Sequence, residues 1–247
     1  MTILSTKWLK PHLWSPLNQR RLSNFRNNKR GYYSLIFFSL LFLCSLFAEL
    51  IANDKPIAVY YDQAVYIPVF NVYPETTFGG DFETETDYRD EYIADLINAK
   101  GWILWPLIRY SYDTINYNLP VPAPAPPSAE NWLGSDDQAR DVVARLIYGF
   151  RISVLFGLSL TIFSTLVGVV IGAIQGFYGG KIDLIGQRFI EIWSGLPVLF
   201  LLIIMTSFIT PNFWWLLGIM LMFSWMMLVD VVRAEFLRAR NLEYVRA

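Results

Sequence analysis

The uncharged stretch ISVLFGLSLTIFSTLVGVVIGAIQGFY, residues 152–178, decides the fold class of this chain. An α-helix rises about 1.5 Å per residue, so about 20 apolar residues cross a hydrocarbon core of about 30 Å. The stretch is longer than this and carries no Asp, Glu, Lys or Arg. Helices buried in soluble domains seldom run so far without a charge, so the stretch predicts a membrane span.

The composition of the whole chain agrees with a membrane protein. Hydrophobic residues make up 54% of the 247 residues and charged residues only 17%, whereas a soluble domain has about 25% charged residues. A single cysteine, Cys44, excludes a disulfide framework within the chain, and one histidine, His12, beside it excludes most zinc sites. The net charge of −1 gives no uniformly basic surface for nucleic acid, and no metal site is expected.

Three further segments approach the length of a span, at residues 33–52, 189–209 and 213–232. A cleavable signal peptide is the alternative for the first, but about thirty polar and basic residues precede it and no clean cleavage site follows. A buried core helix is the alternative for the others, and it is disfavoured by length. The chain is therefore predicted to be an all-α integral membrane protein with four transmembrane helices.

The charges beside the spans predict the orientation of the chain. Residues 1–32 hold seven Lys and Arg and no Asp or Glu, and basic residues next to a span stay in the cytoplasm. The N-terminus is therefore expected inside, residues 53–131 outside as an extracytoplasmic insertion, and residues 233–247 inside. This predicts a multi-pass membrane protein whose two ends both lie in the cytoplasm.

The predicted insertion, residues 53–131, is acidic, aromatic and proline-rich. Within it, residues 81–95 are dense in carboxylates and contain one arginine. A solvated acidic face is the favoured interpretation, and a surface that meets a cationic or peptide ligand is the alternative. Residues 102–118 are rich in aromatic side chains of the kind found at membrane interfaces, and residues 119–128 form a proline-rich spacer.

Residues 132–151 are predicted to form an amphipathic helix on the membrane surface. Ser135 to Gln138 has the form of a capping box, with serine first and glutamine three residues later. Asp141 and Arg145 are four residues apart with the acid first, the favourable order for an ion pair on a helix. Apolar residues at helical spacing complete the pattern, and the helix is expected to lead into the span at 152–178.

Three glycines, Gly168, Gly172 and Gly176, recur every four residues in this span. Such spacing lets two helix backbones approach closely, although glycine is also simply common in membrane helices. Pro197 lacks a backbone donor and predicts a kink in the third span. Both features indicate helix packing and shape, and neither is itself a chemical function.

The remaining polar groups give little support to catalysis or proton coupling. Glu49, Glu191 and Asp230 lie near span ends, where they are expected to reach interfacial water. A carboxylate at mid-membrane would indicate a transport site, and none is found. There is no phosphate-binding loop and no constellation of catalytic Ser, His or Cys. The chain is therefore predicted not to be an enzyme.

One long segment resembles a known family. Residues 133–153, LGSDDQARDVVARLIYGFRIS, resemble the LGTDxxGRDxxSRLIYGxRxS signature of oligopeptide- and dipeptide-type ABC importer permeases. The signature residues of interest are Leu133, Gly134, Asp136, Arg140, Asp141 and Arg145. The glycine run, the Gly179-Gly180 turn with Asp183, and Arg233 also resemble the family. The long insertion resembles the subgroup that imports microcin C and other peptides.

The resemblance implies a six-span permease of the bacterial inner membrane that forms a heterodimer with a second permease subunit. It also implies a periplasmic solute-binding protein, contact with lipid, and cytosolic ATPase subunits that hold ATP and magnesium, so that this chain binds no cofactor. The start of the cytoplasmic EAA loop would couple to the ATPase through Arg238, Leu242, Glu243, Tyr244, Val245, Arg246 and Ala247. Arg246 departs from the family's acid, which puts acid-specific docking contacts in doubt. Because the sequence stops at Ala247, with four of six spans, we expect a fragment of a longer subunit.

The function expected from the sequence is inward movement of peptides or peptide-like compounds by ATP-driven alternating access. A membrane sensor with an external ligand-sensing loop is the first alternative. A proton-coupled carrier is the second, and it would require ionisable groups inside the spans.

Overall fold

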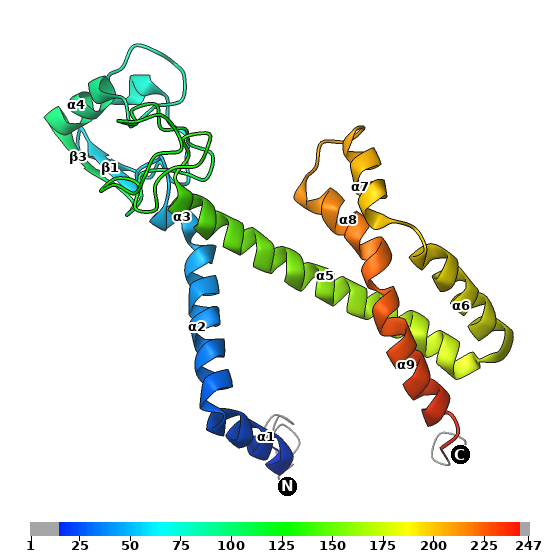
Figure 1. Cartoon of the computed structure of the whole chain (residues 1–247). Helices are drawn as coiled ribbons and strands as arrows, with labels where there is room; N and C mark the ends of the chain where they lie inside the picture. The colour runs from blue at the N-terminus through cyan, green and yellow to red at the C-terminus, as the bar shows by residue number, and fades with distance from the viewer. Residues whose placement is uncertain (1–14, 243–247) are drawn as a thin grey trace, which may run out of the picture. The chain divides into compact units, whose positions relative to one another are not determined.

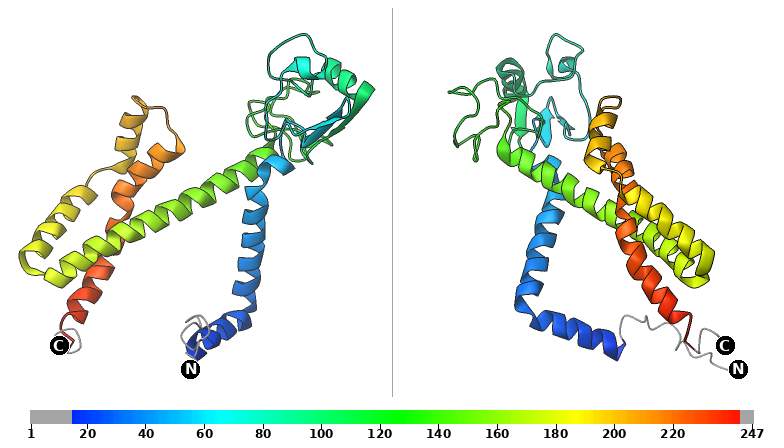
Figure 2. Two further views of the ribbon diagram at one scale, coloured as in Figure 1. Left: turned by 180° about the vertical axis from the view of Figure 1, so that it is seen from behind. Right: turned by 45° about the vertical axis from the view of Figure 1, so that its right-hand side comes forward.

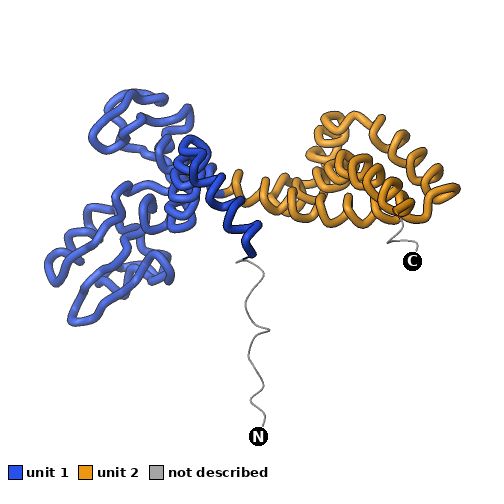
Figure 3. Tube along the Cα trace, turned by 90° about the horizontal axis from the view of Figure 1, so that it is seen from below, with its two compact units in different colours: residues 1–151 blue, residues 152–247 orange. Residues whose placement is uncertain are grey.

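The computed structural model describes residues 15–242, and the predicted coupling residues Glu243, Tyr244, Val245, Arg246 and Ala247 lie outside the described residues. The chain divides into two compact units, Met1–Arg151 and Ile152–Ala247, which Figure 3 distinguishes by colour. Each unit is described by itself below.

The first unit begins with three helices. Helix α1, Pro16–Asn27, starts at Ser15, whose side chain accepts a hydrogen bond from the backbone N–H of Asn18 at 3.3 Å. Helix α2, Lys29–Leu46, carries the apolar run of the predicted first span, and Phe47 separates it from the short helix α3, Ala48–Ile51. The predicted span at 33–52 is thus divided between two helices.

A three-stranded antiparallel sheet follows, with β1 (Ala58–Tyr61) between β2 (Ala64–Tyr66) and β3 (Gly101–Leu104). The turn between β1 and β2 has positive φ at both Asp62 and Gln63, as in the two-residue hairpin turns that match strand twist. A side-chain carbon at Gly101 would stand 1.7 Å from the carbonyl oxygen of Tyr60, so β3 can pair with β1 only through glycine there.

Helix α4, Glu91–Lys100, and a 3-10 turn, η2, at Glu75–Phe78 complete this part of the first unit. Their apolar side chains and those of the sheet form one core, made of Val59, Tyr61, Phe78, Tyr88, Ile93 and Ile97. We call residues 53–131 the sheet segment from here on. The prediction of an all-α chain is wrong for this segment, because strands of three or four residues are too short to produce a visible alternating pattern.

A second core joins α3 to the beginning of the long helix α5, Val142–Tyr178. The hydroxyl of Tyr148 donates to the carbonyl oxygen of Ala52 at 2.9 Å, and Arg151 contacts both carboxylate oxygens of Glu49 at 2.8 and 2.9 Å. Glu49 therefore has a protein partner in addition to any interfacial water. These contacts fix the end of α3 against the first turns of α5.

The helices of the second unit are the rest of α5, then α6 (Gly180–Ser194), α7 (Val198–Thr206), α8 (Phe213–Ser224) and α9 (Met226–Ala239). Figures 1 and 2 show α8 and α9 following one another along the same direction and crossing α5. Within the second unit, α5, α6 and α9 surround a small core of Ile190, Met226 and Val229.

Among the described residues, two helices are long and apolar enough to cross a membrane, Val142–Tyr178 and Phe213–Ala239. Helices α6 and α7 add a third span if they count as one, and they are bent by 61°. The bend lies at Pro197, which precedes the first residue of α7 and confirms the predicted kink. The fourth predicted span, at 33–52, is outside this set, so the four-span count stays a prediction.

Most of the apolar surface of these helices faces outward. Only 6% of the most apolar part of α5 is buried, and α7 has no buried residue. Single exposed apolar residues are ordinary, but continuous apolar faces of this extent mark contact with lipid or with other proteins. The apolar residues from which a membrane protein was predicted are thus exposed on the surfaces of α5 and α7.

Candidate functional site

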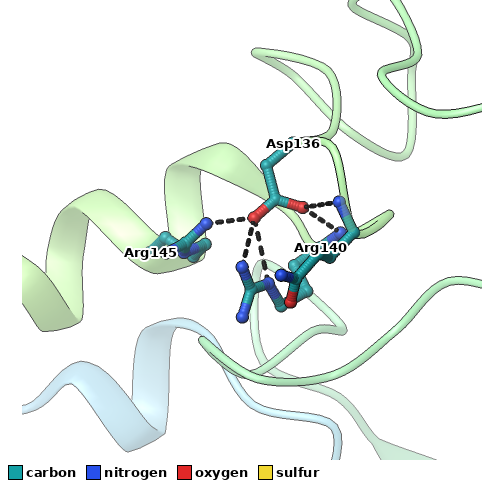
Figure 4. Close-up of polar contacts among 4 residues, drawn as sticks. Asp136, Arg140 and Arg145 are labelled. Carbon is teal, nitrogen blue, oxygen red and sulfur yellow. Dashed lines mark hydrogen bonds and ion pairs between the residues drawn. The ribbon is translucent and has the colours of Figure 1, made fainter.

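Asp136 is the centre of an ion-pair cluster just before α5 (Figure 4). One carboxylate oxygen accepts hydrogen bonds from the backbone N–H groups of Gln138 and Arg140, both at 2.9 Å. The other contacts the guanidinium of Arg140, with its Nε at 2.9 Å, and that of Arg145. A single carboxylate therefore closes the turn that precedes α5 and fixes it to the helix.

The surroundings of Asp136 change its pKa in two opposing ways. Burial raises the pKa, but the hydrogen bonds from Arg140 and Gln138 and the charge of Arg140 favour the ionised form more strongly. Together they lower the pKa from 3.8 to about 2. The carboxylate is consequently ionised at every physiological pH.

The backbone of this turn requires unusual torsion angles. Gly134 has a φ of +77° and Ala139 a φ of +60°. A side-chain carbon at Gly134 would lie 2.3 Å from the carbonyl oxygen of Ala125, so no other residue fits. The signature glycine is thus explained by close approach of two chain segments, while Leu133 beside it is exposed.

The predicted capping box at residues 135–138 is wrong, because α5 begins only at Val142 and runs without interruption to Tyr178. The capping residue is Asp141, whose side chain accepts a hydrogen bond from the backbone N–H of Ala144 at 2.7 Å. The predicted pair of Asp141 with Arg145 is also not formed, since Arg145 contacts Asp136. No separate surface helix precedes the span.

A buried chain of amides holds Asp141 from the other side. Its second carboxylate oxygen accepts from the side chain of Asn131 at 2.8 Å, and Asn131 accepts from Asn116 at 3.3 Å. Asn116 also donates to the hydroxyl of Tyr110 at 2.9 Å. Buried polar groups must be paired to avoid a large desolvation penalty. These hydrogen bonds between side chains therefore fix the position of the sheet segment against the start of α5.

Replacing Asp136 by Asn should destabilise the chain by roughly 2 kcal/mol, the free energy that corresponds to its lowered pKa. Because the folded pKa lies below the unfolded one, this stabilisation is complete above about pH 4 and is lost as the pH falls toward 2. Thermal unfolding of the detergent-solubilised chain across this pH range measures it.

The matched control is Asp137→Asn, in the same turn but exposed. Equal destabilisation by both variants at pH 7 would contradict the assigned role of Asp136.

In the second unit, the three spaced glycines of α5 form the surface on which α9 and the end of α8 lie. A side-chain carbon at Gly168 would lie 2.8 Å from the carbonyl oxygen of Trp225, and one at Gly172 would lie 2.8 Å from that of Val229. At Gly176 the corresponding distance to the carbonyl of Arg233 is 2.6 Å. The two helices touch backbone to backbone at each glycine.

Gly172→Ala should therefore force α5 and α9 apart and destabilise the second unit by on the order of 1–3 kcal/mol. Gly157→Ala, on the same helix with no atom within 4 Å of the added carbon, is the control. It should be neutral or slightly stabilising because alanine favours helix. Thermal unfolding in detergent measures both, and equal effects would argue against close packing.

The turn from α5 into α6 brings together residues that the resemblance singled out. Gly179 and Gly180 have positive φ angles of 63° and 56° and reverse the chain. In the first turn of α6, Asp183 faces Arg233 of α9 in a two-point ion pair, with one contact at 2.7 Å. Arg233 thus contacts α6 through its side chain and Gly176 through its backbone.

The predicted coupling residues that the structure describes lie at the end of α9. Arg238 is 78% exposed and stands 3.9 Å from Glu235, and Leu242 is 40% exposed just beyond the helix. Residues 233–239 continue the helix Phe213–Ala239, so α9 extends seven residues past the predicted end of the span at residue 232. Both side chains are available to a partner.

Some residues of these sites were not expected from the sequence. Asn116 and Asn131 of the amide chain carry no local pattern that distinguishes them from other loop asparagines. Gln175 is buried in the second unit, where it accepts a hydrogen bond from Gln187 at 2.9 Å. Gln175 could have been found in the sequence because it is a polar residue inside an apolar run, next to Gly176.

Comparison with known proteins gives the family. The family described as "Binding-protein-dependent transport system inner membrane component" matches residues 168–247. The inner membrane ABC transporter permease protein YejE of Escherichia coli (strain K12) is 54% identical over 94% of this chain and 68% of that protein. The chain belongs to this family of transporter permeases.

Two further relatives bear other names. The peptidoglycan transport system permease protein YejE of Agrobacterium fabrum is 55% identical over 95% of this chain and 68% of that protein. The dipeptide transport system permease protein DppC of Bacillus subtilis is 37% identical over 49% of this chain and 38% of that protein. As a permease of this family, the chain is a membrane subunit. The residues that match the family, 168–247, include the three spaced glycines of α5, Asp183 and Arg233.

Proposed function

We propose that this permease subunit carries peptides or peptide-like compounds inward as part of an ABC importer. The observation that carries the proposal is the identity of 54% and 55%, across nearly the whole chain, to permeases of an ABC transporter and a peptidoglycan transport system. A relative named for dipeptide transport supports the same substrate class. Microcin C is a candidate within it, suggested by the resemblance of the insertion.

In this proposal the chain crosses the membrane four times, through α2, α5, the bent pair α6 and α7, and α8 with α9. The N-terminus lies in the cytoplasm, and the sheet segment lies outside, where a solute-binding protein delivers substrate. A second permease subunit covers the exposed apolar faces that lipid does not. Cytosolic ATPase subunits bind ATP with magnesium, and the chain itself catalyses no reaction.

The contacts at the end of α9 suggest how movement would be transmitted. An ATPase that displaces Arg238 and Leu242 displaces α9, whose backbone touches α5 at three glycines. The ion pair of Arg233 with Asp183 carries the same displacement into α6. Because a close backbone contact and a two-point ion pair resist sliding, α5, α6 and α9 would move together when access alternates.

The combined substitution Arg238→Ala and Leu242→Ala tests this coupling in the complete complex of both permeases, ATPases and binding protein in proteoliposomes. Peptide-stimulated ATP hydrolysis should fall at least about tenfold, since loss of a central interface anchor costs about 1–2 kcal/mol or more. Arg188→Ala is the control, an exposed arginine that pairs with Glu191 three residues away, as Arg238 pairs with Glu235.

Unchanged stimulation in the double variant would contradict the proposed coupling. Peptide uptake that persists without ATP but requires a proton gradient would favour the carrier instead. Stable signalling by the chain without any ATPase would favour a sensor.

A further inference from the structure

The first unit contains a cavity of about 760 Å³, to which the proposed function assigns no role. Its walls come from helix α4, strand β3, the loop around Trp105 and Arg109, and residues 129–132. Buried Tyr110 and Asn116 also line it. The volume is within the range of about 300–1,000 Å³ that is usual for small-molecule sites.

Two arginines that line this cavity have no acidic partner in the part of the chain that the structure describes. Arg89 lies over the ring of Tyr110, 4.4 Å from its centre, and Arg109 lies over the ring of Trp105 at 5.4 Å. Within residues 15–242, neither guanidinium has a carboxylate at ion-pair distance or a hydrogen-bond acceptor. By contrast, Arg140 and Arg151 of the same unit are paired with acids.

The same cavity holds two carboxylates, Glu91 and Glu130, and neither forms an ion pair within the described part of the chain. Glu130 accepts a hydrogen bond from the hydroxyl of Tyr110 at 3.4 Å. Tyr110 therefore meets Arg89 at its ring face and Glu130 at its hydroxyl, and it sets a positive and a negative group about one side chain apart. Both charges remain free to bind a ligand.

These features favour a ligand with two opposite charges over a sugar. Sugars bind by stacking on open aromatic faces, but guanidinium groups already cover a face of Tyr110 and of Trp105. A guanidinium above a ring keeps its planar, fork-like set of N–H donors, the geometry that binds a carboxylate with two parallel hydrogen bonds. A ligand with a single charge would bind either the two arginines or the two glutamates and leave the other two side chains without a partner in the cavity.

We propose that this cavity binds a short peptide through both of its free termini. The terminal carboxylate is held by Arg89 and Arg109, and the terminal ammonium by Glu91 and Glu130. Trp132, exposed beside them, contacts the side chains in between. The site is distinct from the helices that would form the pore, and its ligand class follows from the cavity's own charges.

Peptides with blocked ends test the proposal on the unaltered full chain in lipid nanodiscs. The probes are trialanine, its C-terminal amide, its N-acetyl form and the doubly blocked form, titrated by calorimetry. Trialanine should bind, each single block should weaken binding about tenfold, and the double block should abolish it, because each block removes the charge-assisted contacts at one end of the peptide. Binding is measured without ATPase or transport, so failure here is distinguishable from failure of the proposed function.

Variants assign each end of the peptide to its residues. Arg89→Gln combined with Arg109→Gln should weaken trialanine at least tenfold and leave binding of its C-terminal amide unchanged. Glu130→Gln should have the complementary effect on the ammonium end. Lys100→Gln is the matched control, since Lys100 also lies over a ring, that of Tyr61 at 5.5 Å, but outside the cavity.

Three outcomes would overturn the proposal. The first is no binding of trialanine at millimolar concentration, and the second is equal binding of all four probes to the unaltered chain. The third is binding of an oligosaccharide of N-acetylglucosamine in place of trialanine, which would identify the cavity as a sugar site. The first two measurements need no variant, so misfolding of a variant cannot hide the result.

Discussion

Close contact between the backbones of α5 and α9 is the constraint on which the second unit depends. Lipid tails are as apolar as leucine side chains, so burial of apolar surface does little to hold two membrane helices together. The two backbones can approach each other here because glycine has no side chain to keep them apart, at Gly168, Gly172 and Gly176. Backbone contact then supplies dispersion interactions along about two helical turns, and the helices form one body.

The ion pair of Asp183 with Arg233 acts on the same body. It joins α6 to α9 through Arg233, the same residue whose backbone carbonyl faces Gly176, and Asp183 follows the turn at Gly179 and Gly180. In the first unit, Asp136 fixes the turn before α5 through Arg140 and Arg145, and Asp141 secures the start of α5 to the sheet segment through buried Asn131. The start of α5 is therefore fixed by carboxylates, and its C-terminal third by the three glycines.

The sequence predicted the elements whose signal is long or chemically strong. The uncharged run at 152–178 predicted most of α5, and Pro197 predicted the bend between α6 and α7. The signature at 133–153 indicated the family. The start of α5 was misplaced because Ser135 to Gln138 fits a capping box locally, whereas the buried contacts of Asp141 with Asn131 are distant in sequence. The strands were missed because three or four residues carry too little alternation.

The cavity charges could not be predicted for a related reason. Arg89 is the one arginine of the acidic stretch 81–95, and no local pattern indicates that its guanidinium lies over the ring of Tyr110. The charged residues that line the cavity come from around the start of α4, from the loop after β3 and from Glu130. Only tertiary structure brings them to one cavity.

The claim that α5 and α9 move as one body is tested most directly by distance measurement between spin labels. Labels at the exposed positions Val170 on α5 and Val231 on α9 would be followed in the complete transporter, without nucleotide and with bound ATP. The account predicts the same distance in both states. A change of about 5 Å or more, the scale of one helical turn, would show that the helices slide past each other and would contradict it.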